Sequence, residues 1–199
     1  MSLLSLDYSV LLFIQDTLRA DWAFPFWETL TDLGNLGLLW ILWDLLLLVR
    51  RRTRRIGFIM LIAIAIDTAL TNGIIKNLAA RPRPFAQFAD IIPLIGRPSD
   101  FSFPSGHAAC SFAAAFTLWK LSSRPMGIVA LLMASLIALS RLYLGVHYPS
   151  DILGGLLTGY VASAMALFMN AKLSLFEHLC PSDTIKESKT KSGSNKEDS

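Results

Sequence analysis

The sequence predicts an all-α membrane protein: a polytopic helix bundle of about five spanning helices, preceded by an interfacial amphipathic N-terminal segment. The chain of 199 residues is 53% hydrophobic and only 17% charged, with a mean hydropathy of +0.50, whereas a soluble domain is typically about one quarter charged. The charge is also uneven, because residues 152–171 carry none while five arginines stand within residues 50–55. This composition excludes disordered, collagen-like and disulfide-stapled chains, and it argues against an ordinary soluble enzyme.

Apolar runs long enough to cross a bilayer define the predicted spans. A helix needs about 20 apolar residues to cross a hydrocarbon core of roughly 30 Å. The predicted spans are 33–49, 57–75, 105–119, 126–144 and 152–171. Two acidic residues stand within them. We expect Asp44 to lie near the inner headgroups and to contact Arg50 or its neighbours, and Asp67 to make a buried polar contact between helices, with a proton relay as the alternative.

The first 32 residues have a different pattern. Apolar residues recur at helical spacing along residues 3–17, with Ser5, Ser9 and Asp16 opposite, which is typical of an amphipathic helix in the interface. An aromatic cluster at 22–27 fits headgroup depth, and a short sixth span is the alternative. The sequence thus divides into an interfacial helical segment at 1–32, a membrane domain at 33–175, and a polar, disordered tail at 176–199.

Basic residues predict the orientation of the bundle. If five helices alternate, the loop at 50–55, Lys120, Arg124 and Lys172 all fall on one side, which the positive-inside rule makes cytoplasmic. The net charge of +3 and the pI of about 9.0 therefore need no nucleic acid partner. Cys110 and Cys180 fall on opposite sides, so no disulfide is expected.

Six ionisable side chains from separate parts of the chain fall on the opposite face. They are Lys76, Arg83, His107, Arg141, His147 and Asp151. Ionisable groups near lipid are kept mainly where a cavity or pathway uses them, and three cations around one point suit a phosphate dianion. Ser105 is a good N-cap for the next apolar helix, and Gly106 lets a ligand approach the free N–H groups of its first turn.

The spacing of His147 and Asp151 suggests covalent catalysis. The carboxylate can accept one ring N–H and leave the other ring nitrogen as a nucleophile, and His107 can protonate the leaving oxygen. No metal-binding motif and no Walker loop is present, so we expect no metal and no cofactor. The arginines, the lysine and backbone N–H groups would then stabilise the developing charge.

Three motifs in order carry a family resemblance: Lys76 followed after six residues by Arg83-Pro84, then Pro104-Ser105-Gly106-His107, then Ser140-Arg141 followed by His147 and Asp151. Over about residues 30–171 the chain resembles the type 2 phosphatidic acid phosphatases, which are membrane lipid phosphatases. The resemblance implies a metal-independent phosphohistidine mechanism with His147 as nucleophile, Asp151 as the residue that orients it and His107 as acid. It also implies a phosphate clamp made of Lys76, Arg83, Ser105, Gly106 and Arg141.

Residues 81–85 and 147–151 are similar to short bacterial members of that family. The resemblance therefore implies an integral protein of a bacterial cytoplasmic membrane, with an extracytoplasmic active site and a cytoplasmic tail. The expected substrate is undecaprenyl pyrophosphate, or else phosphatidic acid or phosphatidylglycerophosphate. A phosphotransferase with an alcohol acceptor and a non-enzymatic transporter of anionic lipid remain alternatives, and the oligomeric state stays open. Arg81 is expected to be an interfacial charge, with contact to a second phosphate as the alternative.

Overall fold

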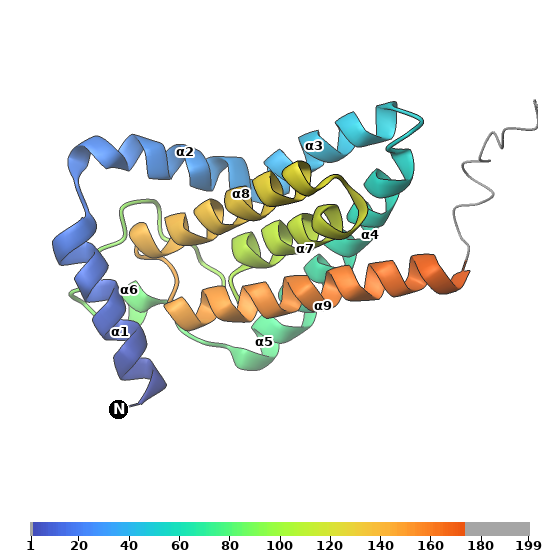
Figure 1. Ribbon diagram of the computed structural model, residues 1–199. Coiled ribbons are helices and arrows are strands. Elements are labelled where there is room, and N and C mark those ends of the chain that lie inside the picture. The colour runs from blue at the N-terminus through green and yellow to red at the C-terminus, as the bar shows by residue number, and fades with distance from the viewer. Residues whose placement is uncertain (1, 174–199) are drawn as a thin grey trace, which may run out of the picture.

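The computed structural model describes residues 2–173, and these form a helical bundle without a β-strand (Figure 1). The segments are α1 Leu3–Phe13, η1 Ile14–Leu18, η2 Asp21–Ala23, α2 Phe24–Gly34, η3 Asn35–Gly37, α3 Leu38–Val49, α4 Arg54–Thr68, η4 Ala69–Ile75, α5 Lys76–Ala79, α6 Pro84–Gln87, α7 Gly106–Leu121, α8 Arg124–Tyr143 and α9 Pro149–Leu173. The predicted tail at 176–199, His178 and Cys180 lie outside the described residues.

The predicted membrane bundle is confirmed. Within residues 2–173, four helical stretches are long and apolar enough to span a bilayer: Asp21–Val49, Arg54–Gln87, Arg124–Tyr143 and Pro149–Lys172. The fifth predicted span is α7, which has 16 residues and is therefore only about 24 Å long. It runs through the middle of the bundle against α4, α8 and α9, so protein rather than lipid surrounds most of it.

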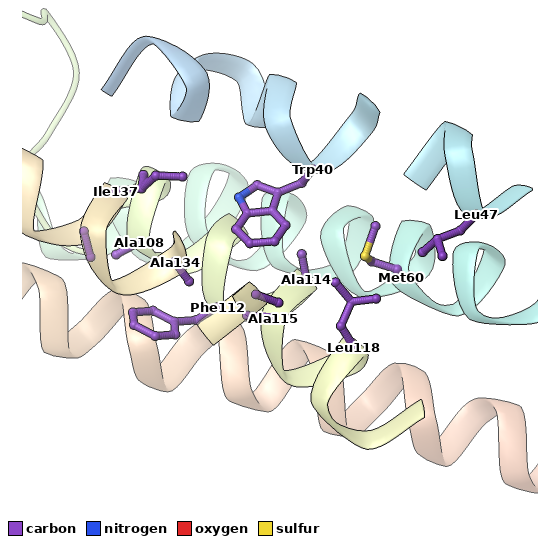
Figure 2. Packing of buried hydrophobic residues seen from close by; sticks show 12 residues of the cluster. Trp40, Leu47, Met60, Ala108, Phe112, Ala114, Ala115, Leu118, Ala134 and Ile137 are labelled. Carbon is purple, nitrogen blue, oxygen red and sulfur yellow. The ribbon is translucent and has the colours of Figure 1, made fainter. Parts of the chain in front are cut away.

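The core around α7 depends on small residues and one large aromatic residue. Alanines such as Ala108, Ala114 and Ala115 are fully buried on α7 and let neighbouring helices approach closely. Figure 2 shows the indole of Trp40 reaching from α3 into this space. Its Nε1 donates a hydrogen bond to the Ser111 hydroxyl of α7 at 2.9 Å, which satisfies the buried N–H.

The first span is longer than predicted and is kinked. Residues 33–49 were expected as the span, but the helical stretch begins at Asp21 and continues through η3. Leu36 and Gly37 have φ values of 52° and 68° there, and this left-handed backbone breaks the helix between α2 and α3. The N-terminal half of the span escaped prediction because it carries polar residues, of which Glu28, Thr31 and Asp32 line a cavity of the protein.

Helix α1 presents two different faces. Leu3, Leu6 and Phe13 are exposed, as expected of the lipid side of an interfacial helix, whereas Asp7 and Leu11 are buried. Helix α1 packs on α9 through this second face. The division at residue 32 remains a prediction, although residues on both sides of it line the same cavity, as described below.

The two membrane-embedded carboxylates behave differently. Asp67 accepts a hydrogen bond from Thr71 at 3.2 Å within the same helical stretch, and the Thr71 hydroxyl lies 3.3 Å from that of Thr158 on α9. The polar contact between helices expected of Asp67 is therefore made by Thr71 instead. The contact expected between Asp44 and Arg50 was wrong. Asp44 is buried toward Gly57 of α4, and its Oδ1 has no hydrogen-bond partner among the described residues.

The basic loops lie at one end of the bundle. Figure 1 shows the α3–α4 turn, the α7–α8 turn and the C-terminal end of α9 at the same end, with the α8–α9 turn at the other. The arginines of 50–55 are therefore separated from His147 by the length of the bundle, as the alternating topology requires. Which end faces the cytoplasm remains a prediction from the positive-inside rule.

A glycine seam joins α9 to α7 and sets the distance between two of the predicted motifs. A Cβ on Gly155 would lie 2.7 Å from the carbonyl oxygen of Ser105, and one on Gly159 would lie 2.5 Å from that of Ala109. Both obstacles are backbone atoms, which do not rotate away. The seam therefore holds the start of α7 directly against the first turns of α9.

We expect Gly159→Ala to lower the free energy of unfolding by about 1–3 kcal/mol, because the added methyl overpacks the seam. Gly73→Ala is the matched control, since a Cβ at Gly73 has no atom within 4 Å. The apparent melting temperature of both variants in detergent is the measurement. Equal melting temperatures for the two variants would show that the seam is not tightly packed.

Candidate active site

A cavity of about 660 Å³ is lined by residues of α2, η3, α4, η4, α5, α7 and α8 and of the loops before α7 and α9. Six of the eight predicted site residues line it: Lys76, Arg83, Gly106, His107, Arg141 and His147. The other two, Ser105 and Asp151, are completely buried behind its wall. The structure therefore gathers three separate stretches of the chain at one place.

His147 and Asp151 form the pair that the sequence predicts. The Nδ1 of His147 lies 3.3 Å from Asp151 Oδ2, and both side chains are buried. On the other side of the ring, Arg83 Nη1 lies 3.2 Å from Nε2. A guanidinium can only donate, so Nε2 accepts, the ring is neutral, and its proton sits on Nδ1, where it is donated to Asp151. Nε2 thus carries the lone pair of a nucleophile, which accepts the Arg83 N–H in this structure.

Burial favours this neutral ring. Desolvation lowers the pKa of His147 to about 4, and the nearby charges of Arg83 and Arg141 act in the same direction, while the hydrogen bond to Asp151 opposes them. His147 is therefore unprotonated over the physiological pH range. Asp151 is held in turn by the Tyr148 backbone N–H at 2.9 Å and by the Ser102 hydroxyl at 2.5 Å.

Two cations of the clamp share one carboxylate. Lys76 and Arg83 both form ion pairs with Asp100, the latter at 2.6 Å, and Asp100 is half exposed. Burial opposes ionisation of Asp100, but the hydrogen bond from Lys76 and the charges of Arg83 and Lys76 outweigh it and lower its pKa to about 2. Asp100 is therefore an anion at the position where cations would hold a phosphate oxygen.

Arg141 is the least satisfied of the three cations. Its side chain is buried, and Nη1 donates to the Thr31 hydroxyl of α2. Its Nε is buried and has no hydrogen-bond partner among residues 2–173. A buried unpaired N–H of a charged group is costly, so this donor in the cavity wall indicates an anionic ligand.

His107 faces the cavity from the first turn of α7. Its Nε2–H donates to Asn35 Oδ1 at 2.9 Å. Ser105 is the N-cap of α7, as predicted, and its own N–H donates to the Asp151 carbonyl at 3.1 Å. A Cβ on Gly34 would lie 2.8 Å from His107 Cδ2, so the imidazole packs directly on the backbone of α2.

Comparison with known proteins decides the family. Residues 55–174 match the PAP2 superfamily. The chain belongs to the PAP2 superfamily. It is 38% identical over 120 residues to an undecaprenyl-diphosphatase of Sulfolobus acidocaldarius, a match that covers 60% of this chain but only 58% of that relative.

Two solved PAP2-type structures share the fold. A phosphatidylglycerolphosphate phosphatase from Bacillus subtilis superimposes with a TM-score of 0.69 at 28% identity, covering 85% of this chain and 87% of that one. LpxE from Aquifex aeolicus gives 0.71 at 26% identity, covering 84% and 96%. The PAP2 match contains all eight predicted site residues, and the spanning helices make this PAP2 chain an integral membrane protein.

Sequence reasoning missed one wall of the PAP2 cavity. Four polar residues of α2 and η3 line it: Glu28, Thr31, Asp32 and Asn35. Their i, i+3, i+4, i+7 spacing marks one helix face and was the signal that could have found them. Asp100 also escaped, because nothing in an irregular loop indicates its distant partners. Within residues 2–173, no group of three or more His, Cys, Asp or Glu could hold a metal ion.

We expect Asp100→Asn to tighten the binding of inorganic phosphate by about fivefold. The carboxylate competes with phosphate for two cations, and a half-exposed ion pair is worth roughly 1 kcal/mol. Calorimetry at neutral pH measures the Kd, with Asp90→Asn as the control on the same loop, since Asp90 contacts Tyr8 instead. Weaker binding by Asp100→Asn would mean that the carboxylate orients the cations rather than competing for them.

Proposed function

We propose that this PAP2 protein is a membrane lipid phosphatase that hydrolyses a lipid phosphate or pyrophosphate through a phosphohistidine at His147. The observation that carries the proposal is the neutral imidazole whose Nε2 lone pair faces a cavity of cations while Nδ1 faces Asp151. A nucleophile, a residue that orients it and an anion site in one place are the parts that acyl and phosphoryl transfer require.

In the first step the phosphate takes the place of Asp100 on Lys76 and Arg83, and Arg141 Nε supplies a further donor. The Nε2 lone pair of His147 forms a bond to phosphorus as the bond from phosphorus to the leaving oxygen breaks. The ring then carries a positive charge, which the Asp151 carboxylate stabilises. The clamp cations stabilise the charge on the peripheral oxygens.

Proton transfer falls to His107. The leaving oxygen accepts a proton from the imidazolium form of His107, which the bound phosphate dianion stabilises, and His107 becomes a neutral imidazole in the same cavity. His107, now a base, accepts a proton from water as the water oxygen attacks phosphorus and the P–N bond breaks. Inorganic phosphate leaves, His147 regains its lone pair, and His107 is again protonated for the next cycle. We propose that the clamp supplies the charge stabilisation without a metal ion.

Undecaprenyl pyrophosphate is the substrate that we propose first, followed by phosphatidic acid or phosphatidylglycerophosphate. The names of the Sulfolobus and Bacillus subtilis proteins support both classes. The proposed setting is a bacterial cytoplasmic membrane, with the cavity on the extracytoplasmic side and the tail in the cytoplasm, because the basic loops lie at the opposite end of the bundle from His147.

We expect His147→Ala to lower phosphate release from undecaprenyl pyrophosphate by about 10³-fold or more, because the covalent route is lost. The measurement is phosphate release in detergent with and without EDTA, together with trapping of labelled phosphoenzyme in the parent. His178→Ala, which changes the third histidine, is the control. Equal release by His147→Ala and the parent would refute the nucleophile, and a strict requirement for added divalent metal would refute the mechanism.

The lowered pKa of His147 predicts the pH profile. A pKa below the ordinary value of about 6.5 keeps Nε2 unprotonated to lower pH, so the acid limb of kcat/KM should lie near pH 4. The profile is measured with a monophosphate and with a pyrophosphate substrate. An acid limb that has the same midpoint with both substrates reflects a group of the enzyme, because titration of a substrate group would give a different midpoint for each. A shared midpoint near the ordinary histidine value would contradict the buried, neutral ring.

A further inference from the structure

Arg81 lies beside the active site without facing it. The residue precedes the Arg83-Pro84 motif and is not part of the cavity lining. Its guanidinium stacks on the ring of Tyr148 with 3.9 Å between Cζ and the ring centroid. The alternative role expected from the sequence, contact with a second phosphate, would need free donors pointing into the cavity.

The donors of Arg81 are instead bound by two carboxylates. Nη1 donates to Asp151 Oδ1 at 2.7 Å, and Nη2 donates to Asp7 Oδ2 at 2.7 Å. Nη1 also lies 2.7 Å from the Ser150 hydroxyl. A planar guanidinium can hold two acceptors in a fixed relative position, which an ammonium group cannot do.

Asp7 brings the N-terminal helix into this arrangement. It is 2% exposed although it belongs to α1, whose other face is open. Besides Arg81, it accepts the Ser150 backbone N–H at 3.0 Å and the Ser150 hydroxyl at 2.5 Å. Ser150 lies in the first turn of α9, so Asp7 satisfies a free N–H at the helix terminus and adds a favourable negative charge there.

The two oxygens of Asp151 have separate partners as a result. Oδ2 accepts from His147, Tyr148 and Ser102, whereas Oδ1 accepts from Arg81 alone among residues 2–173. Arg81 thus fixes the rotation of the carboxylate that orients the imidazole. Because Asp7 shares the same guanidinium, Arg81 does not neutralise Asp151 fully, and negative charge stays available to the ring.

We propose that Asp7 and Arg81 are positioning residues for phosphoryl transfer, so that α1 is part of the catalytic apparatus and acts through Asp151. This inference rests on the proposed function, because it assigns their effect to a phosphoryl group on His147. Without Asp7, the guanidinium pairs with Asp151 only. The carboxylate then stabilises the positively charged phosphoimidazole less well, while the clamp cations are untouched.

The test uses the full-length protein and two variants of equal size. Asp7→Asn should lower kcat about tenfold with KM within about twofold, since an interaction made only in the transition state affects kcat alone. Asp16→Asn, an exposed aspartate of the same N-terminal region, should match the parent. Rates are divided by the amount of protein in the monodisperse gel-filtration peak, so that unfolded protein is not counted.

Arg81→Lys provides an independent measurement if Asp7→Asn folds poorly. Lysine keeps the positive charge but cannot hold both carboxylates in a fixed relative position, so kcat should fall about as much as in Asp7→Asn. In the double variant kcat should fall by no more than in the weaker of the two single variants, because both substitutions act through the same contact with Asp151. Parent-like kcat in both single variants, a change confined to KM, or additive losses would overturn the inference. A parent that forms no phosphoenzyme with any lipid phosphate would overturn the proposed function itself.

Discussion

The gathering of positive charge in a poorly solvated cavity is the constraint on which the other features depend. Lys76, Arg83 and Arg141 converge in the wall of one cavity, and like charges removed from water repel strongly unless anions balance them. Asp100 balances two of them, and Arg141 is left with a neutral hydroxyl and one unpaired N–H. Glu28 and Asp32 also line the cavity, but neither forms an ion pair with Arg141 among the described residues, so a phosphate dianion is the ligand that we propose for its unpaired N–H.

Packing behind the cavity wall keeps these charges in place. The alanines of α7 and the glycines of α9 let the two helices approach until a single added Cβ would touch backbone. Through this contact the Ser105 N–H reaches the Asp151 carbonyl, so that the start of α7 is hydrogen-bonded directly to the start of α9. A close-packed apolar bundle thus supplies the rigidity that a preorganised polar site needs.

The sequence predicted the bundle and eight site residues because both have local signals. Apolar runs identify spans, and alternating topology delivers the motifs between 76 and 151 to one end. The remaining parts depend on contacts between distant residues that no periodicity shows. Asp7 and Asp100 meet their arginines only in the folded chain. The partner expected for Asp44 was wrong because this side chain packs toward Gly57 of α4 instead of pairing with the arginines of the next loop.

The cavity has two walls with different origins. The wall that carries the nucleophile, the acid and the clamp belongs to residues 55–174, which the PAP2 match covers. The opposite wall comes from α2 and η3, before that stretch, and its Glu28, Thr31, Asp32 and Asn35 are polar groups of a kind that can contact the rest of a headgroup. The chemistry thus depends on the common part of the fold. Because only groups beyond the reacting phosphate differ among a glycerol, a sugar and a second phosphate, we expect the N-terminal wall to contribute to discrimination between such substrates.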